Sequence, residues 1–463
     1  MPSYYHNTNY IKPFMNTILR SMLSVAMLSV MAGAYADSPD NIENYFLGYL
    51  QGETSPYISG NIVKSRDVKA VSDQVWKSWV DANKAFDEQK LSPLAALSAE
   101  TASAWNLPAD LEPNAVMNYY WGFKGDSISS AGIPLFIYMH GSGPRQQEWE
   151  TGLKLAVRFD DSPSAYFIPQ IPNEGEYYRW WHKSKQYAWE KVLRQSLASG
   201  EIDPDRVYMF GISEGAYGSQ RLASFYADYI AGAGPMAGGE PLKNAPAENL
   251  RNTAFSLLTG DRDFGFYRDK LTRYTKRALD SLKQVYPEDY EYNIQLIPGR
   301  GHSIDYTPTT PWLSKHTRNP YPKHVSWENF EMDGRYRDGF YNLYVNERSN
   351  ADESARTYYE MDIVGNTVNL TAQTVTYTAT EIDPRWGIAL DFKREYAPAT
   401  SGSVTIYLND SLVDLSKPVI VIVNGKKVFK GKLKMRMENI VNSCARYYDP
   451  SRLYPAAVTI DIR

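Results

Sequence analysis

A serine flanked by two glycines is the clearest candidate for chemistry in the chain, because Gly211-Ile-Ser-Glu-Gly215 has the spacing G-x-S-x-G. An apolar run at 207–210 comes before it, and residues 214–230 carry apolar side chains at helical spacing. A tight turn from strand to helix lifts such a serine hydroxyl clear of the sheet, and a Cβ atom at either glycine would clash there. The same pentapeptide also arises by chance, so the order strand, turn, helix carries the interpretation. We predict that Ser213 is a nucleophile.

A serine hydroxyl is a weak nucleophile and needs a histidine base that is itself oriented by a carboxylate. His302 directly follows an apolar run, which places it in a loop at the carboxyl edge of a sheet, whereas the other histidines beyond residue 36 are placed less well. The carboxylate is expected between serine and histidine, and Gly260-Asp-Arg-Asp263 offers two. We favour Asp263, since its distance from Gly260 lets the loop turn back over the sheet; Asp261 is the alternative.

Acyl transfer also needs hydrogen-bond donors for the oxyanion. The backbone N–H of Glu214, directly after the nucleophile, is one candidate. A glycine loop at the end of an early apolar strand, His140-Gly-Ser-Gly143, offers the other, and we predict that the N–H of Ser142 supplies it. An ordinary glycine turn is the alternative interpretation of this loop.

Composition and the first residues narrow the class of protein. The 463 residues have a formal net charge of -4 without a basic stripe, which excludes nucleic acid as an expected partner. Cys444 is the only cysteine, so internal disulfides and cysteine-based metal sites are excluded. Residues 21–33 form an apolar run after Arg20, and Ala34-Tyr-Ala36 is a small-x-small cleavage site. We therefore expect residues 1–36 to be a signal peptide of a secreted or periplasmic protein, because the apolar run at 21–33 is too short to span a bilayer as a stable anchor.

The rest of the chain divides into three parts by periodicity. Residues 37–113 have a helical pattern and are expected to pack on the main domain, and residues 114–319 alternate strands with helices, which predicts an α/β domain with a mostly parallel sheet. Residues 320–463 contain short β-rich runs and are expected to form a separate all-β sandwich, with a hairpin turn at Asn424-Gly425. In the α/β part, strands are expected at 116–123, 134–139, 165–169, 207–210, 229–233, 254–258 and 292–297.

With these residues in this order, the chain resembles the α/β-hydrolase family over about residues 116–306. The resemblance rests on the HGSG, GISEGAYG, GDRD and GRGHS segments, and the runs at 135–141 and 202–208 are most similar to secreted polyhydroxybutyrate depolymerases and feruloyl esterases. It implies an α/β-hydrolase fold and a serine hydrolase that works through an acyl-enzyme, with no metal and no organic cofactor. Ala216 departs from that branch, which usually has a second glycine there, and the C-terminal β domain is an addition to it.

The substrate is less clearly indicated. The aromatic-rich stretch 172–182 can wall a cleft, and we single out Trp181 and His182 from it as substrate-binding residues, although its tryptophans can equally be core residues of the next helix. Asp305 and Tyr306, close after His302, are expected to line the same cleft. The leading hypothesis is an ester hydrolase acting on small or polymeric esters, including those of carbohydrates. The alternatives are a serine peptidase of the prolyl-oligopeptidase type and an inactive binding protein with the same fold.

Overall fold

A computed structural model describes residues 38–349 and 355–463 of the chain. The expected signal peptide at 1–36 lies outside these residues. In the described part, none of the helices combines the length and the apolar content that crossing a bilayer would take.

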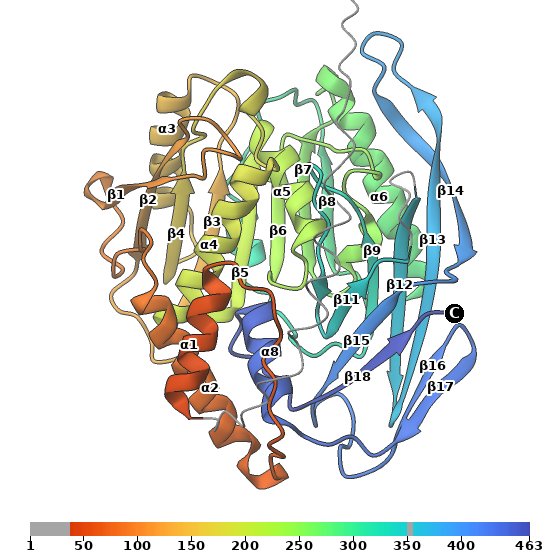
Figure 1. Cartoon of the computed structure of the whole chain (residues 1–463). Coiled ribbons are helices and arrows are strands. Elements are labelled where there is room, and N and C mark those ends of the chain that lie inside the picture. Colours follow the sequence, from red (N-terminus) through yellow and green to blue (C-terminus); the bar gives the residue numbers. More distant parts are fainter. Residues whose placement is uncertain (1–37, 350–354) are drawn as a thin grey trace, which may run out of the picture.

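The first part of the structure is an eight-stranded sheet in the order β1-β2-β4-β3-β5-β6-β7-β8 (Figure 1). Strands β1, β2 and β4 pair antiparallel, and the pairs from β4–β3 onward are parallel. This order, with helices in the crossovers, is the α/β-hydrolase fold. The strands are β1 (Ala102–Asn106), β2 (Val116–Lys124), β3 (Ile133–Met139), β4 (Ser164–Pro169), β5 (Ile202–Ile212), β6 (Gly232–Met236), β7 (Ala254–Gly260) and β8 (Tyr292–Ile297).

Strand β3 illustrates how the sheet is buried on both faces. Leu135, Ile137 and Met139 belong to one apolar core, while the alternate residues Phe136 and Tyr138 belong to a second core on the opposite face. Side chains of α4, α5 and α6 close the first core, and those of α3 and α7 close the second. These helices are α3 (Arg145–Arg158), α4 (Lys183–Ser199), α5 (Glu214–Phe225), α6 (Arg268–Val285) and α7 (Thr309–Leu313).

The C-terminal part consists of two sheets around a common apolar core, which makes it a β-sandwich. One sheet has the order β10-β11-β15-β18, and the other has the order β17-β16-β13-β12-β9 with β14 paired to β13. Its strands are β9 (His324–Asn329), β10 (Gly339–Phe340), β11 (Leu343–Glu347), β12 (Ala355–Val364), β13 (Thr367–Ile382), β14 (Ala389–Pro398), β15 (Ser403–Leu408), β16 (Val419–Val423), β17 (Lys426–Gly431) and β18 (Ala456–Asp461). The predicted Asn424-Gly425 turn is confirmed, with φ of 47° and 77°.

The N-terminal helices differ from expectation in their packing partner. α1 (Pro39–Leu50) and α2 (Val68–Ala85) form a small core with α8 (Met437–Tyr447), a helix inserted in the C-terminal part. In this core Phe46 and Trp79 meet Ile440 and Cys444. α8 offers an apolar face that the sequence pattern of the β region did not reveal. Residues 37–113 also contact the hydrolase domain as expected, since Trp105 and Leu107 belong to its core and Arg194 of α4 donates to Asn83 of α2.

Two expected boundaries also need correction. β1 lies before residue 114 yet pairs with β2, so the hydrolase sheet begins inside the segment expected to be helical. β5 is bounded at Ile202, but its regular pairing with β3 begins at Val207, and residues 203–206 lie in a register shift where Asp203 Oδ1 accepts from the Asp205 N–H at 3.0 Å. β6 begins at Gly232 rather than at Tyr229.

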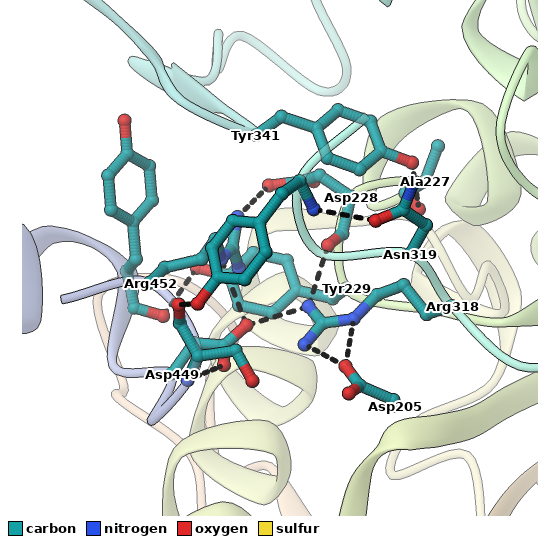
Figure 2. A network of polar contacts seen from close by, with 12 residues as sticks. Asp205, Ala227, Asp228, Tyr229, Arg318, Asn319, Tyr341, Asp449 and Arg452 are labelled. Carbon is teal, nitrogen blue, oxygen red and sulfur yellow. Dashed lines mark hydrogen bonds and ion pairs between the residues drawn. The ribbon is translucent and has the colours of Figure 1, made fainter. Parts of the chain in front are cut away.

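A buried network of charges joins the two parts of the molecule (Figure 2). Arg452 Nη1 lies 2.6 Å from Asp228 Oδ2, and its Nε lies 2.9 Å from Asp449 Oδ2. Arg318 Nη1 lies 2.6 Å from Asp449, and Arg337 pairs with Asp228. Burial alone raises the pKa of Asp228, but the two arginines more than offset it, so its pKa lies below the ordinary value. The β-sandwich thus contacts the hydrolase domain through a buried ionic network, in addition to the apolar core between its own two sheets.

Candidate active site

Ser213 sits in the turn between β5 and α5 in a conformation that L-residues rarely adopt, with φ 58° and ψ -110°. Two glycines make this turn possible. A Cβ atom on Gly215 would lie 1.9 Å from the carbonyl oxygen of Met139, and one on Gly211 would lie 2.6 Å from the same oxygen. The elbow therefore packs directly against the end of β3, which fixes the position of the serine hydroxyl at the carboxyl edge of the sheet.

Ala216 replaces the glycine found in the most similar branch, and the structure accommodates its methyl group through a different glycine. A Cβ atom on Gly238 would lie 2.4 Å from Cβ of Ala216. The absence of a side chain at Gly238, after β6, therefore leaves room for the methyl group of Ala216 on α5. The elbow keeps its geometry with alanine at this position.

His302 and Asp263 meet Ser213 at this edge. His302 Nε2 lies 3.0 Å from Ser213 Oγ, and His302 Nδ1 lies 2.7 Å from Asp263 Oδ2. The Asp263 side chain is 3% exposed and that of His302 is 47% exposed. The carboxylate accepts from Nδ1–H, which leaves Nε2 free to accept the serine proton. The loops after β5, β7 and β8 thus bring the three residues together as the spacing predicts.

The two neighbouring carboxylates have different partners. Asp261 Oδ1 accepts a hydrogen bond from the Gly299 backbone N–H at 2.8 Å, so Asp261 closes the turn after β8. Asp263 receives, besides His302, a hydrogen bond from Arg268 Nη1 to Oδ1 at 3.1 Å. Arg268 begins α6 and was not found by sequence reasoning, because nothing in the local pattern distinguishes it from the other cations of that helix.

The glycine loop at 140–143 lies beside the nucleophile, since a Cβ atom on Gly141 would be 3.5 Å from Cβ of Ser213. Its carbonyls are held from outside: Tyr178 Oη donates to Gly141 O at 2.7 Å, and Trp180 Nε1 donates to His140 O at 3.0 Å. His140 is buried, and burial lowers its pKa to about 4, so it is neutral at physiological pH.

The expected oxyanion donors stay predictions, with the following geometry in their favour. Ser142 lies one residue beyond Gly141 in the fixed loop and is exposed. Glu214 is the first residue of α5, and the N–H of a first-turn residue has no intrahelical acceptor. Burial raises the pKa of the Glu214 side chain to about 7, although Arg179 Nη1 lies 3.5 Å away. The helix thus begins with a free N–H at the serine and a carboxyl group that is about half ionised near neutral pH.

The four expected substrate-binding residues are placed differently from one another. Tyr306 is half-buried and packs against the core that includes Trp149 of α3 and Leu313 of α7. Burial raises the pKa of its hydroxyl, and the carboxylate of Asp263 adds to this rise. Asp305 accepts from the N–H and hydroxyl of Thr307 at 3.0 and 2.7 Å, so its carboxylate is used in its own turn.

The aromatic stretch at 172–182 belongs in part to the core, which agrees with the alternative that its tryptophans are core residues. Trp180 is fully buried against Trp189, whereas Trp181 is half-buried with the Arg221 guanidinium 3.7 Å from its ring. His182 is the N-cap residue directly before α4, and its ring packs edge-on against Tyr177. Trp181 therefore contacts α5, the helix that directly follows Ser213, through Arg221. Across the described ranges, no group of three or more His, Cys, Asp or Glu side chains is arranged to hold a metal ion.

Comparison with known proteins adds a resemblance in sequence. No family model matches the chain. It is 44% identical over 67 residues to poly(3-hydroxyalkanoate) depolymerase C of Paucimonas lemoignei, covering 14% of this chain and 16% of the relative. It is 29% identical over 147 residues to NocK of Nocardia uniformis subsp. tsuyamanensis, provisionally named an esterase, covering 28% of this chain and 40% of that one. The matches thus span less than half of either relative.

Solved structures that resemble the chain include a thermostable esterase, at 17% identity and a TM-score of 0.36, covering 47% of this chain and 64% of that one. A ferulic acid esterase has 13% identity and a TM-score of 0.36, covering 46% of this chain and 97% of that one. The strand order of the chain itself gives it an α/β-hydrolase fold with a C-terminal β domain. In sequence it resembles a polyhydroxyalkanoate depolymerase and an esterase.

Proposed function

We propose that the protein is a serine hydrolase that cleaves carboxylic esters. The observation that carries this proposal is the continuous hydrogen-bonded row from Ser213 Oγ to His302 Nε2 at 3.0 Å and from His302 Nδ1 to Asp263 Oδ2 at 2.7 Å. Such a row lets the serine lose its proton as it attacks, and the buried carboxylate stabilises the imidazolium that forms. An inactive binding protein has no use for this arrangement, which weighs against that alternative.

In the proposed reaction, the Ser213 hydroxyl transfers its proton to His302 Nε2 while Oγ forms a bond to the ester carbonyl carbon. The carbonyl oxygen takes up the displaced electron pair and is held by the N–H groups of Glu214 and Ser142. Each such donor contributes about 3 to 4 kcal/mol where it has been removed in other hydrolases. When the tetrahedral adduct collapses, His302 gives its proton to the leaving alcohol, and an acyl-enzyme on Ser213 remains.

Water completes the cycle by the same route. His302 Nε2 accepts a proton from the water molecule that attacks the acyl carbon, and the proton then returns to Ser213 Oγ as the carboxylic acid leaves. The half-exposed ring of His302 gives water access to this nitrogen without opening the fold.

The proposed substrates are esters of polymers, either polyesters or acylated polysaccharides, and the resemblance to a polyhydroxyalkanoate depolymerase supports this class. The small-x-small site after the apolar run at 21–33 supports export to the periplasm or the medium. A polymer too large to enter the cell is consistent with both the resemblance to a depolymerase and the proposed export.

A fluorophosphonate probe and a panel of p-nitrophenyl esters, acetylated and feruloylated sugars and aminoacyl-p-nitroanilides test the proposal. We expect labelling of Ser213 alone and turnover of esters, with kcat in Ser213→Ala lower by at least about a thousandfold. Ser303→Ala, a change of the exposed serine next to His302, is the matched control and should label normally. Labelling that persists in Ser213→Ala refutes the assignment, and turnover of anilides without esters indicates a peptidase instead.

A further inference from the structure

The loop that holds Asp263 continues into exposed aromatic residues. Phe264 is 68% exposed and Phe266 is 51% exposed. Phe266 and Tyr267 have φ of 51° and 59°, which is unfavourable for residues with a Cβ atom and persists only where surrounding contacts enforce it. The conformation of this loop therefore depends on what packs against it.

The contacts come from the β-sandwich. The tip of the β13–β14 hairpin places Trp386 against Phe266, with ring centroids 5.0 Å apart and planes 25° from parallel. Tyr267 Oη donates a hydrogen bond to Asp383 Oδ1, and the other oxygen of Asp383 accepts from the Trp386 backbone N–H at 2.6 Å. One carboxylate thus both closes the hairpin tip and attaches it to the loop of the triad acid.

The hairpin is also fixed along its length. Figure 1 shows β13 and β14 running beside α6. Lys270 pairs with Glu381, Tyr274 Oη donates to the other oxygen of Glu381 at 2.6 Å, and Arg277 Nη2 lies 2.9 Å from Asp391 Oδ2. The three donors are four and three residues apart, which places them on one face of the helix. The tip is therefore held in place beside the acid loop.

Large hydrophobic side chains remain exposed at this junction beside two exposed cations, Arg262 and Arg385. Of the thirteen exposed large hydrophobic side chains among the described residues, four belong to the acid loop and the hairpin tip, and we call these four the apolar patch: Phe264, Phe266, Ile382 and Trp386. An exposed cluster of this kind is typical of a binding surface. The hydroxyl of Tyr267 and the carboxylate of Asp383 are paired with each other, and the exposed Arg385 guanidinium lies 4.5 Å from the Trp386 ring. The patch therefore offers apolar side chains to a hydrocarbon chain, with a cation at its edge.

The patch is connected to the reacting groups through Arg268. Its guanidinium lies 5.3 Å from the Phe266 ring and also donates to Asp263 Oδ1. We propose that the apolar patch binds the hydrocarbon chain of the ester substrate, so that the β-sandwich determines preference for long-chain esters and polyesters. This inference rests on the proposed ester hydrolysis at Ser213.

A chain-length series tests the proposal, with p-nitrophenyl esters from acetate to dodecanoate and a polyester film as substrates. Trp386→Ala and Phe264→Ala are each expected to lower kcat/KM for the dodecanoate about tenfold while leaving that for acetate within about twofold. Tenfold corresponds to about 1.4 kcal/mol, less than the burial of two methylene groups. Tyr396→Ala, which removes another exposed aromatic ring of β14, is the matched control and should keep the chain-length profile.

The outcomes separate this inference from the function on which it rests. Equal losses on acetate and dodecanoate mean that the residues act only through the position of Asp263, and the chain-binding proposal is then wrong. It is also wrong if both variants keep the full profile, or if they lose activity only on feruloyl or acetyl sugar esters. In each of these cases the proposed function is unaffected, provided that the wild-type protein hydrolyses the acetate and Ser213→Ala does not. Absence of ester turnover in a wild-type protein that labels at Ser213 refutes that function itself.

Discussion

Replacing Asp263 by asparagine is expected to abolish most activity because of the two groups that face its carboxylate. One oxygen accepts from His302 Nδ1 at 2.7 Å and the other from Arg268 Nη1 at 3.1 Å. An amide has a single acceptor oxygen, and Arg268 is always a donor. The amide oxygen therefore turns to Arg268, and its NH₂ group faces His302. Nδ1 must then be the acceptor, so the proton moves to Nε2, which can no longer accept from Ser213.

The expected cost is about ten thousandfold in kcat, the size of effect that a wrong histidine tautomer has in other serine hydrolases. The melting temperature should change little, because the amide has the same shape as the acid. The assay is hydrolysis of p-nitrophenyl acetate together with a thermal melt. Asp261→Asn is the matched control: its amide oxygen can still accept from Gly299 N–H, so kcat should stay near normal and stability should fall by no more than about 1 kcal/mol.

A double variant tests the orientation argument itself. In Asp263→Asn with Arg268→Met, no donor fixes the amide, which can turn its oxygen to His302 Nδ1 and restore the active tautomer. We expect kcat to rise at least about tenfold above that of Asp263→Asn alone, with Arg268→Met measured beside it. If the second change gives no recovery, the tautomer explanation is wrong. If Asp261→Asn is the inactive variant, the loop carries its functional acid at the earlier position.

Three other substitutions test the elbow at Gly215, the side chain of Glu214 at the start of α5, and the junction between the hydrolase domain and the β-sandwich at Arg452. Gly215→Ala places a Cβ atom 1.9 Å from Met139 O, so we expect loss of soluble protein or of fluorophosphonate labelling, and normal labelling would contradict the close packing. Because the pKa of Glu214 is raised to about 7, the folded state binds its proton more tightly than the unfolded state, and stability is lost as pH rises from about 4.5 to about 7. The free energy of unfolding of Glu214→Gln at pH 8 should therefore exceed that of the wild type by at most about 3 kcal/mol, with no gain at pH 4. An equal gain at both pH values would exclude ionisation of Glu214 as the cause. Arg452→Met removes one of two cations from buried Asp228 and should lower the free energy of unfolding by about 3 to 5 kcal/mol in urea titrations, against less than about 1 kcal/mol for the exposed pair member Lys393→Met.

The elements around Ser213 could be predicted from sequence because their signals are local. A glycine that avoids a clash lies within two residues of the serine, and an apolar run directly precedes each loop that carries a candidate residue. The order of these loops then follows from the rule that ligands and catalytic groups gather at the carboxyl ends of parallel strands. The choice of Asp263 over Asp261 was reasoned from loop length alone, and the hydrogen bonds of the two residues agree with it.

Features that depend on distant pairing could not be predicted. Arg268 matters because α6 begins beside Asp263, and Trp386 because a hairpin more than a hundred residues later docks on the acid loop. β1 is a five-residue strand recognisable only by its pairing with β2, and α8 interrupts a region whose composition favours strands. In each case the deciding contact joins segments whose local patterns carry no information about each other.

The buried network at the junction has a consequence for the order of events during synthesis. Asp228 is made 224 residues before Arg452, which at roughly 5 to 20 residues per second is a delay of roughly 11 to 45 s. The last strands of the hydrolase sheet, β6 to β8, are made within this interval, while the carboxylate of Asp228 still lacks one of its cations. Enclosing it unpaired is costly, so the junction stays open and hydrated until Arg452 arrives. The junction is then completed only when nearly the whole chain has been made, so the two domains reach their final arrangement late in synthesis.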